Sequence, residues 1–394
     1  MVSGWKRMLA LFSLASFVEV IAYGQLSAFT PLHLPTIGVA PQDVAFAVGA
    51  LTAGANILGV AFLPFWGVLA DRYGRKPLII RSFAATGAGL AMAALARDVV
   101  GFGVARGLTA LNLGNSGLMM TTLAERAPAA RIGFAFGVVN GAGPLGAFLG
   151  PLVGGPLVDL YGFSAILAVD AVLLGAVVLM LVFGYRDGFI PERNGPPILR
   201  GAFDGLALIW RSPRLRYLFP AMLVMFAGWL LTFTYVPLVV ATIHSGPDVA
   251  TAIGIVLGAG GLVTLAASPG IGALADRFGI WRMLYVFAIA DALLWLLPWS
   301  TRDYIPFVLA WALVNGIGSG VFSLSFNALS ESATDATRAR VMTFAYLPLN
   351  LGLIVGPGIG GLAASADPFN VFPLATLFAL SGVAFLAIAK RQPL

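Results

Sequence analysis

The chain contains no cysteine and few charged residues. Only 10% of its 394 residues carry a charge, whereas a soluble protein carries roughly a quarter. Without cysteine it can form neither disulfide bonds nor thiolate metal sites. In place of charge it has 59% hydrophobic residues, in runs of about 20 that are long enough to cross about 30 Å of hydrocarbon as helices. These features exclude an ordinary soluble domain and predict an all-α polytopic membrane protein.

The sequence also lacks the motifs of nucleotide and metal chemistry. It has no G-x-x-x-x-G-K-S/T loop, so ATP is not expected to be the direct energy source. No His and Cys residues are spaced as metal ligands. The net charge of +6 comes from basic residues in short loops, which argues against a nucleic-acid partner. We therefore expect no enzymatic activity, no cofactor and no metal.

Twelve membrane spans are predicted from the apolar runs. They cover residues 8–30, 43–66, 78–96, 99–123, 134–157, 162–184, 216–241, 249–271, 283–299, 304–328, 341–363 and 370–389. With the N-terminus inside, 20 of the 23 Lys and Arg residues fall in the inner loops and tails or at the span ends beside them. Because Lys and Arg concentrate in cytoplasmic loops, we expect both termini to be cytoplasmic and the chain to lie in the inner cell membrane.

Two motifs occur twice at nearly the same interval. Gly67 and Gly272 begin similar charged segments 205 residues apart, and Gly150 and Gly356 begin glycine–proline pairs 206 residues apart. A constant interval in two unrelated motifs indicates a duplicated chain. Duplication predicts two pseudo-symmetric six-helix bundles, with a substrate path between them near mid-depth.

The longest polar stretch divides the chain between predicted spans six and seven. We predict an N-terminal bundle over residues 1–184, a cytoplasmic linker over residues 185–215 and a C-terminal bundle over residues 216–394. Within the linker, Leu199–Trp210 could form a short amphipathic helix on the inner membrane surface.

Two charged segments lie between long apolar runs. Residues 67–76 read G-V-L-A-D-R-Y-G-R-K, and residues 272–279 read G-A-L-A-D-R-F-G. The first resembles the loop between helices two and three of major facilitator superfamily transporters. The second falls where that family places the loop between helices eight and nine. The candidate gating residues are Gly67, Asp71, Arg72, Gly74, Arg75, Lys76, Asp276 and Arg277.

The resemblance implies an inner gate at the first charged segment. Asp71 would face the N-terminal end of span eleven, near Val341, and hold the two bundles together when the pore faces outward. Plain positive-inside topology is the alternative, but it requires only the basic residues and not the aspartate or the glycines.

A glycine–proline tract in predicted span five has a second copy in span eleven. The fixed positions of the two copies include Gly137, Gly146, Gly150, Pro151, Gly154, Gly155, Gly356 and Pro357. The tract resembles the antiporter motif of the family, which is associated with exporters that exchange substrate for protons. It implies a bent helix with a smooth face at the seam between the bundles. Ordinary packing through small residues is the alternative.

Four ionisable residues lie well inside predicted spans, away from the span ends: Glu19, Arg106, Asp170 and Asp291. Such a residue costs at least about 2.5 kcal/mol unless it is paired or hydrated, so each is a functional candidate. Arg106 resembles the basic residue of the proton-linked motif of the family, although the Gln and Gly that usually follow are absent. We predict proton coupling by Glu19 with Arg106. The alternative is a static ion pair between them.

Asp170 and Asp291 lie in spans that are peripheral in this family, so structural roles are predicted for both. Polar and aromatic residues in other spans could line a permissive cavity. The substrate-binding candidates are Tyr23, Gln25, Asn112, Asn115, Trp229, Phe233, Tyr235, Asn315 and Asn350.

Taken together, the motifs resemble those of the 12-helix drug:proton antiporters. The resemblance implies a monomeric secondary transporter that needs no cofactor. Inward proton movement would drive the export of small hydrophobic or cationic compounds by rocker-switch alternating access. A sugar or metabolite exporter and a lysolipid transporter of the same fold are the alternatives. A non-transporting membrane receptor is disfavoured by the two rocking motifs.

Overall fold

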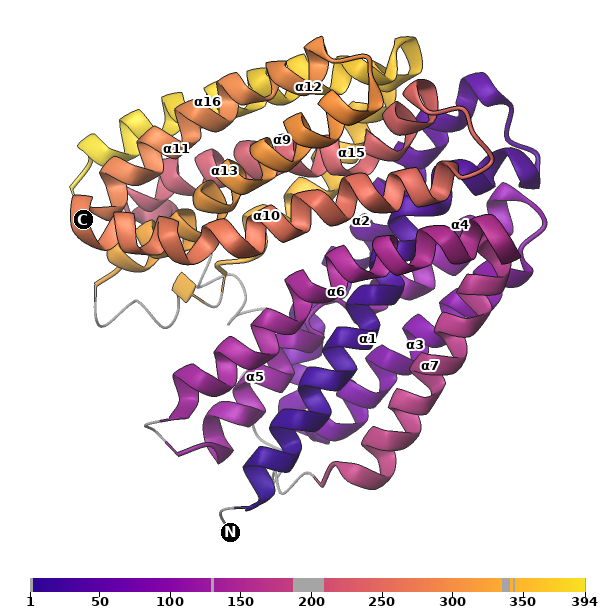
Figure 1. Cartoon of the computed structure of the whole chain (residues 1–394). Helices are drawn as coiled ribbons and strands as arrows, with labels where there is room; N and C mark the ends of the chain where they lie inside the picture. Colours follow the sequence, from indigo (N-terminus) through magenta and orange to yellow (C-terminus); the bar gives the residue numbers. More distant parts are fainter. Residues whose placement is uncertain (1–2, 129–130, 187–208, 335–340, 343, 394) are drawn as a thin grey trace. The chain divides into compact units, whose positions relative to one another are not determined.

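The computed structural model describes residues 3–128, 131–186, 209–334, 341–342 and 344–393. These residues form helices joined by short turns, and they contain no β-strand (Figure 1). The helices are α1 (Ser3–His33), η1 (Leu34–Ile37), η2 (Pro41–Asp43), α2 (Val44–Tyr73), α3 (Arg75–Leu95), α4 (Val99–Thr109), η3 (Ala110–Asn112), α5 (Asn115–Arg126), α6 (Ile132–Tyr161), α7 (Phe163–Gly184), α9 (Leu215–Ile243), α10 (Val249–Phe278), α11 (Ile280–Leu294), α12 (Leu296–Ser300), α13 (Tyr304–Glu331), α15 (Leu347–Ala366), η5 (Pro368–Asn370) and α16 (Val371–Arg391).

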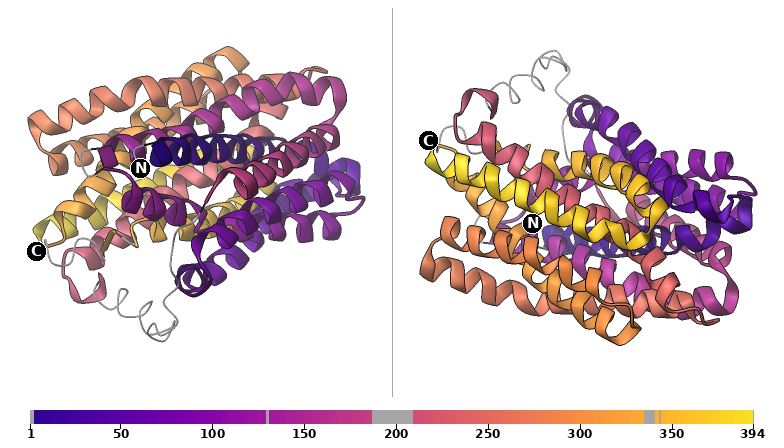
Figure 2. Two further views of the ribbon diagram at one scale, coloured as in Figure 1. Left: turned by 90° about the horizontal axis from the view of Figure 1, so that it is seen from below. Right: turned by 90° about the horizontal axis from the view of Figure 1, so that it is seen from above.

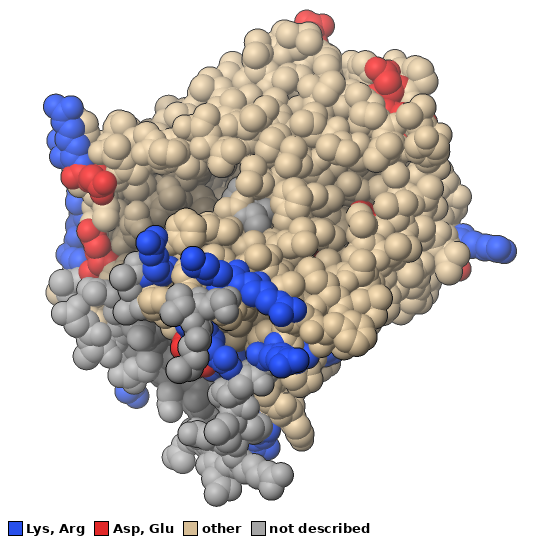
Figure 3. Space-filling view, turned by 60° about the horizontal axis from the view of Figure 1, so that its bottom comes forward, with Lys and Arg blue, Asp and Glu red and all other residues tan. Residues whose placement is uncertain are grey.

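The membrane-spanning character of the chain is confirmed. Among the described residues, ten helical segments are long and apolar enough to cross a membrane. They correspond to ten of the twelve predicted spans. The fifth span is α6, and its part Leu145–Tyr161 is apolar but shorter than these ten segments. Wide areas of the surface in Figure 3 carry no charged side chain, as expected of helices that face lipid.

The fourth predicted span, residues 99–123, is wrong as a single helix. Helix α4 ends at Thr109, the turn η3 follows, and α5 begins at Asn115. Gly114 lies between them with a φ of +92°. Glycine adopts this conformation without the steric cost that a side chain would add, so the chain can break the helix here and restart it.

Other boundaries differ in ways that matter for the charged segments. Helix α2 continues to Tyr73, beyond the predicted end of span two, and α10 continues to Phe278. Both segments that we interpreted as loops are therefore mostly helical. Helix α15 begins at Leu347, later than the predicted start of span eleven. The amphipathic helix predicted over Leu199–Trp210 lies almost wholly outside the described residues.

The helices group into two compact units. One unit comprises Met1–Val39 and Gly54–Ile198, and the other comprises Ala40–Ala53 and Leu199–Leu394. In the first unit α1 packs along α6 and α7, and α3 packs on α7. In the second unit α9 packs along α15 and α16, and α11 packs on α16. Figure 2 shows these neighbours from two further directions. Each unit therefore repeats the same scheme of helix partners, as duplication predicts.

Aromatic side chains fill the interior of each unit. The first unit buries Phe12, Phe29, Phe83 and Phe102, and the second buries Tyr235, Trp295, Phe307, Trp311 and Phe372. Lipid tails are as apolar as these side chains, so close packing rather than escape from water holds such helices together. Glycines at the helix contacts therefore matter as much as the large residues.

Candidate functional site

The first charged segment is a sharp turn between two helices. Helix α2 ends at Tyr73 and α3 starts at Arg75, so Gly74 alone makes the turn with φ +90° and ψ 158°. This backbone region is essentially restricted to glycine. Lys76 then donates to the carbonyl oxygen of Val182 at 2.7 Å. The turn therefore ties α3 to the end of α7.

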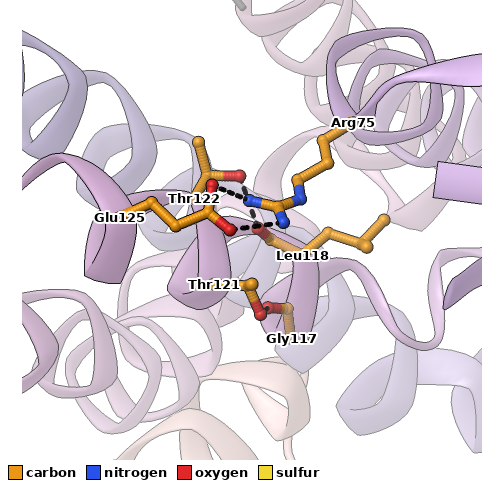
Figure 4. A network of polar contacts seen from close by, with 6 residues as sticks. All are labelled: Arg75, Gly117, Leu118, Thr121, Thr122 and Glu125. Atoms are coloured by element: carbon orange, nitrogen blue, oxygen red, sulfur yellow. Dashed lines mark hydrogen bonds and ion pairs between the residues drawn. The ribbon is translucent and has the colours of Figure 1, made fainter. Parts of the chain in front are cut away.

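Arg75 is buried and forms a two-pronged ion pair with Glu125 at the end of α5. Both nitrogen–oxygen distances are 2.7 Å (Figure 4). The Arg75 side chain is 8% exposed, and that of Glu125 is 51% exposed. Parallel hydrogen bonds of this kind fix orientation as well as adding energy. The predicted gating residue Arg75 thus joins two helices of its own unit.

The second charged segment has the same backbone and a different chemistry. Gly279 makes the turn between α10 and α11 with a φ of +90°, while Asp276 and Arg277 are exposed. Ile280 and Trp281 follow the turn and pack against a buried apolar cluster. This turn is therefore anchored by apolar packing.

The predicted contact between the gating segment and span eleven falls outside the described residues. The side chain of Asp71 is not described, nor are residues 335–340 and 343 before α15. Arg72 is exposed. The gate remains a prediction.

The glycine tract of α6 forms a groove that holds α1. A methyl group at Gly150 would lie 2.7 Å from the Ile21 carbonyl oxygen, and one at Gly146 would lie 3.0 Å from that of Phe17. A methyl group at Gly137 would meet nothing within 4 Å. The tract therefore allows two helices of one unit to approach backbone to backbone.

The second copy of the tract performs the same role for α9. Gly356 faces the carbonyl oxygen of Ala227, and Gly360 faces the ring of Tyr235. The Tyr235 hydroxyl donates to the Pro357 carbonyl oxygen at 2.7 Å. Tyr235 is fully buried, so this predicted substrate ligand instead links α9 to α15 through a hydrogen bond.

The predicted proton-coupling residue Glu19 lies in α1 opposite the break in span four. It is 7% exposed, and its Oε1 accepts a hydrogen bond from Asn112 Nδ2 at 3.1 Å. Asn112 is the last residue of η3. Because the helix is interrupted there, the amide group of Asn112 reaches the carboxylate. Asn115, at the start of α5, is also buried.

Arg106 of α4 is also buried, and it contacts α1 closer to the C-terminal end of that helix. Its Nη1 donates to Thr30 Oγ1 at 3.1 Å. Thr30 follows Glu19 by eleven residues, about 16 Å along a helix. The hydrogen bonds described for Glu19 and Arg106 thus lead to different partners, three turns apart on α1. Proton coupling by this pair stays a prediction.

Two substrate candidates of the second unit, Trp229 and Asn315, are hydrogen-bonded to each other. Trp229 Nε1 donates to Asn315 Oδ1 at 3.3 Å, and the Asn315 amide donates to the Trp311 carbonyl oxygen at 2.9 Å. The Phe233 ring stacks on Trp229 with centroids 5.5 Å apart. Both rings are half-buried, so they form an aromatic surface held by a buried asparagine.

The remaining candidates are less defined. Gln25 is buried against Gly154, while Tyr23 and Asn350 are half-buried. Asp291 Oδ2 accepts a hydrogen bond from Trp295 at 3.1 Å, which is compatible with the structural role predicted for it. No group of three metal-ligand residues occurs in the part of the chain that the structure describes.

Sequence reasoning missed two contributors. The ion-pair partner Glu125 is an acid at the edge of a predicted inner loop that is otherwise rich in basic residues, which was a usable signal. The helix break was signalled by the turn-forming residues Asn112, Gly114 and Asn115. Inside a long apolar run, however, we interpreted these residues as part of one span.

Comparisons with known proteins agree with this architecture. The family model described as Major Facilitator Superfamily matches residues 11–290. Multidrug resistance protein MdtG of Salmonella paratyphi A (strain ATCC 9150 / SARB42) is 27% identical over 375 residues, covering 93% of this chain and 91% of that protein. The protein of the same name from Yersinia enterocolitica serotype O:8 / biotype 1B is 26% identical over 406 residues, covering 99% and 95%.

Solved structures have the same fold at lower identity. The nucleoside transporter NupG superposes with a TM-score of 0.78 at 17% identity, covering 98% of this chain and 100% of that one. A bacterial homologue of the human lysosomal transporter Spinster gives 0.79 at 14% identity, covering 98% and 96%. The family match spans most of the chain and the fold extends over nearly all of it. The chain therefore belongs to the Major Facilitator Superfamily and is a multi-pass membrane transporter.

Proposed function

We propose that the chain is a proton-coupled exporter of small hydrophobic or cationic compounds, and that Glu19 exchanges a proton for substrate. The observation that carries the proposal is the buried Glu19 carboxyl facing the Asn112 amide. An amide has both donors and an acceptor. Its NH₂ group can serve the ionised carboxylate, and its oxygen can accept from the protonated acid. Such a partner suits an acid that alternates between two protonation states inside a membrane.

The relatives support the substrate class. The proteins from Salmonella and Yersinia are named multidrug resistance proteins. The stacked Trp229 and Phe233 rings offer a flat apolar surface to a planar or cationic compound. An apolar ring surface places few directional requirements on a ligand, which favours a broad range of substrates over one specific substrate.

The exporter would work by alternating access, as a monomer driven by the proton gradient. Alternating access of the two bundles would expose the site to each side in turn, with the Asp71 segment as inner gate. The protein would act as a monomer in the inner cell membrane with both termini in the cytoplasm, and the proton gradient would supply the energy.

The test is export of a lipophilic cation into inverted membrane vesicles energised by a proton gradient. We expect uptake to collapse when a protonophore is added, and to be lost in Glu19→Gln. Glu19→Asp, which keeps the carboxyl, should retain part of the activity. Transport of a sugar or a lysolipid in place of the cation, or uptake that survives the protonophore, would contradict the proposal.

A further inference from the structure

Arg81 lies inside the membrane-spanning helix α3 and reaches the break in span four. Its Nη2 donates to the Leu111 carbonyl oxygen at 3.0 Å and to Ser82 Oγ at 2.8 Å. The guanidinium carbon is 3.3 Å from the centroid of the Trp66 ring in α2. An arginine stacked on a tryptophan is attracted to the ring face. The guanidinium is therefore fixed by contacts from several directions.

The carbonyl that Arg81 binds belongs to the interrupted turn. Leu111 is the middle residue of η3, and the next residue, Asn112, donates to Glu19. A helix break leaves carbonyl groups without their usual amide partners. Arg81 donates a hydrogen bond to one such carbonyl, that of Leu111. Leu111 directly precedes Asn112, which donates to Glu19.

The neighbouring helix confines the same turn. A methyl group at Gly59 of α2 would lie 2.6 Å from the Ala110 carbonyl oxygen, and one at Gly114 would lie 3.6 Å from Trp66. The turn is thus packed against α2 and hydrogen-bonded by α3. Its position depends on both contacts.

Arg81 occupies this place at an energetic cost. Its Nε and Nη1 are buried without a hydrogen-bond partner among the described residues. An unpartnered polar group away from water is costly, and a cation within a span more so. A methionine could fill the space beside Trp66 without that cost, so packing alone does not account for the guanidinium.

We propose that Arg81 is a positioning residue of the Glu19 site: it binds the interrupted turn through Leu111 and thereby sets where Asn112 meets the carboxylate. The inference rests on the proposed exchange of a proton for substrate at Glu19. Arg81 acts through Asn112 and need not touch substrate.

The test is a double-substitution cycle on the pH profile of proton release when a lipophilic cation binds the purified full-length protein. Arg81→Met and Asn112→Ala are each expected to shift the midpoint in the same direction, by about one pH unit for a lost hydrogen bond to a charged group. Together they should shift it no further than Asn112→Ala alone, because coupled residues are not additive. Arg97→Met, an exposed arginine just beyond the outer end of α3, is the control and should leave the midpoint unchanged.

A purely structural Arg81 would give a different pattern. Arg81→Met would then lower thermal stability and leave the midpoint where it was, which would overturn the inference. Additive shifts in the double variant would overturn it as well.

If the Arg81→Met protein does not fold, Arg81→Lys is used in the same experiment. Lysine keeps the charge but not the flat stack on Trp66, so a partial shift supports the inference and no shift overturns it. Proton release that persists in Glu19→Gln would instead contradict the proposed function.

Discussion

The two units share their helix partners but differ in chemistry at positions 205 residues apart. The differences are Arg75 and Ile280, Arg106 and Trp311, and Asn112 and Ile317. In each pair the first unit has a polar or charged side chain and the second has an apolar or aromatic one. Duplication has therefore kept the packing scheme in both units, while the ionisable groups of the candidate site lie in the first.

The fourth span is also built differently in the two units. The fourth span of the first unit is broken at Gly114, whereas α13 of the second is continuous from Tyr304 to Glu331. In α13, Gly320 faces the Phe287 ring and Gly318 faces Asp291, so its glycines serve close packing. In the first unit the break lets Asn112 reach Glu19, and α13 has no corresponding break.

The largest effect is expected where the two units are alike. Gly150→Ala and Gly356→Ala should each lower the free energy of unfolding in detergent by about 1–3 kcal/mol, because the added methyl would press on a neighbouring backbone. Gly137→Ala is the control, since a methyl group there meets open space. Equal stability of all three variants would show that the glycine groove is not needed for packing.

Loss of the acid at the end of α5 should have a larger effect than loss of the acid at the end of α13. Glu125→Ala leaves the buried Arg75 guanidinium without its carboxylate and should cost about 1 kcal/mol, because the half-exposed acid is partly screened. Glu331→Ala, at the exposed end of α13, should change stability by less than about 0.5 kcal/mol. Thermal unfolding of the two variants side by side measures the difference. A larger loss in Glu331→Ala would reverse the comparison.

The substrate side of the comparison is tested at Trp229. Trp229→Ala should weaken binding of an aromatic cation about fivefold through loss of ring stacking, and should leave the pH dependence of binding unchanged. Asn112→Ala should change the pH dependence. Binding measured by fluorescence at several pH values separates the two. A pH shift in Trp229→Ala would place proton chemistry in the second unit as well.

The smallest effect concerns the C-terminal end of α9. The hydrogen bond from His244, at 2.9 Å, lowers the pKa of the Asp248 carboxyl below its ordinary value. This hydrogen bond stabilises the folded protein at pH values above the pKa of the unfolded carboxyl, about 3.9. The stabilisation is lost as the pH falls through the lower pKa of the folded state. Thermal midpoints of the parent and Asp248→Asn should therefore differ slightly at pH 6 and converge in stronger acid. In the first unit His33 contacts the neutral Thr36, so Thr36→Val should show no such convergence.

Sequence predicted the architecture because its signals are long-range and redundant. The apolar runs predict the spans, and the repeated motifs predict two six-helix bundles. The error in the fourth span therefore did not change the predicted fold. The site was harder. Glu19 and Asn112 could be named as candidates, but their contact depends on a break set by Gly114. The role of Arg81 depends on the same break, which no periodic pattern reveals.

The central claim is that Glu19 releases a proton when substrate binds. It is tested most directly by adding a lipophilic cation to the detergent-purified protein in weakly buffered solution and recording proton release. Asp170→Asn and Asp291→Asn serve as controls, since they remove the other buried acids predicted within spans. The account predicts release from the parent and from both controls, and none from Glu19→Gln. Release from Glu19→Gln equal to that of the parent would contradict it.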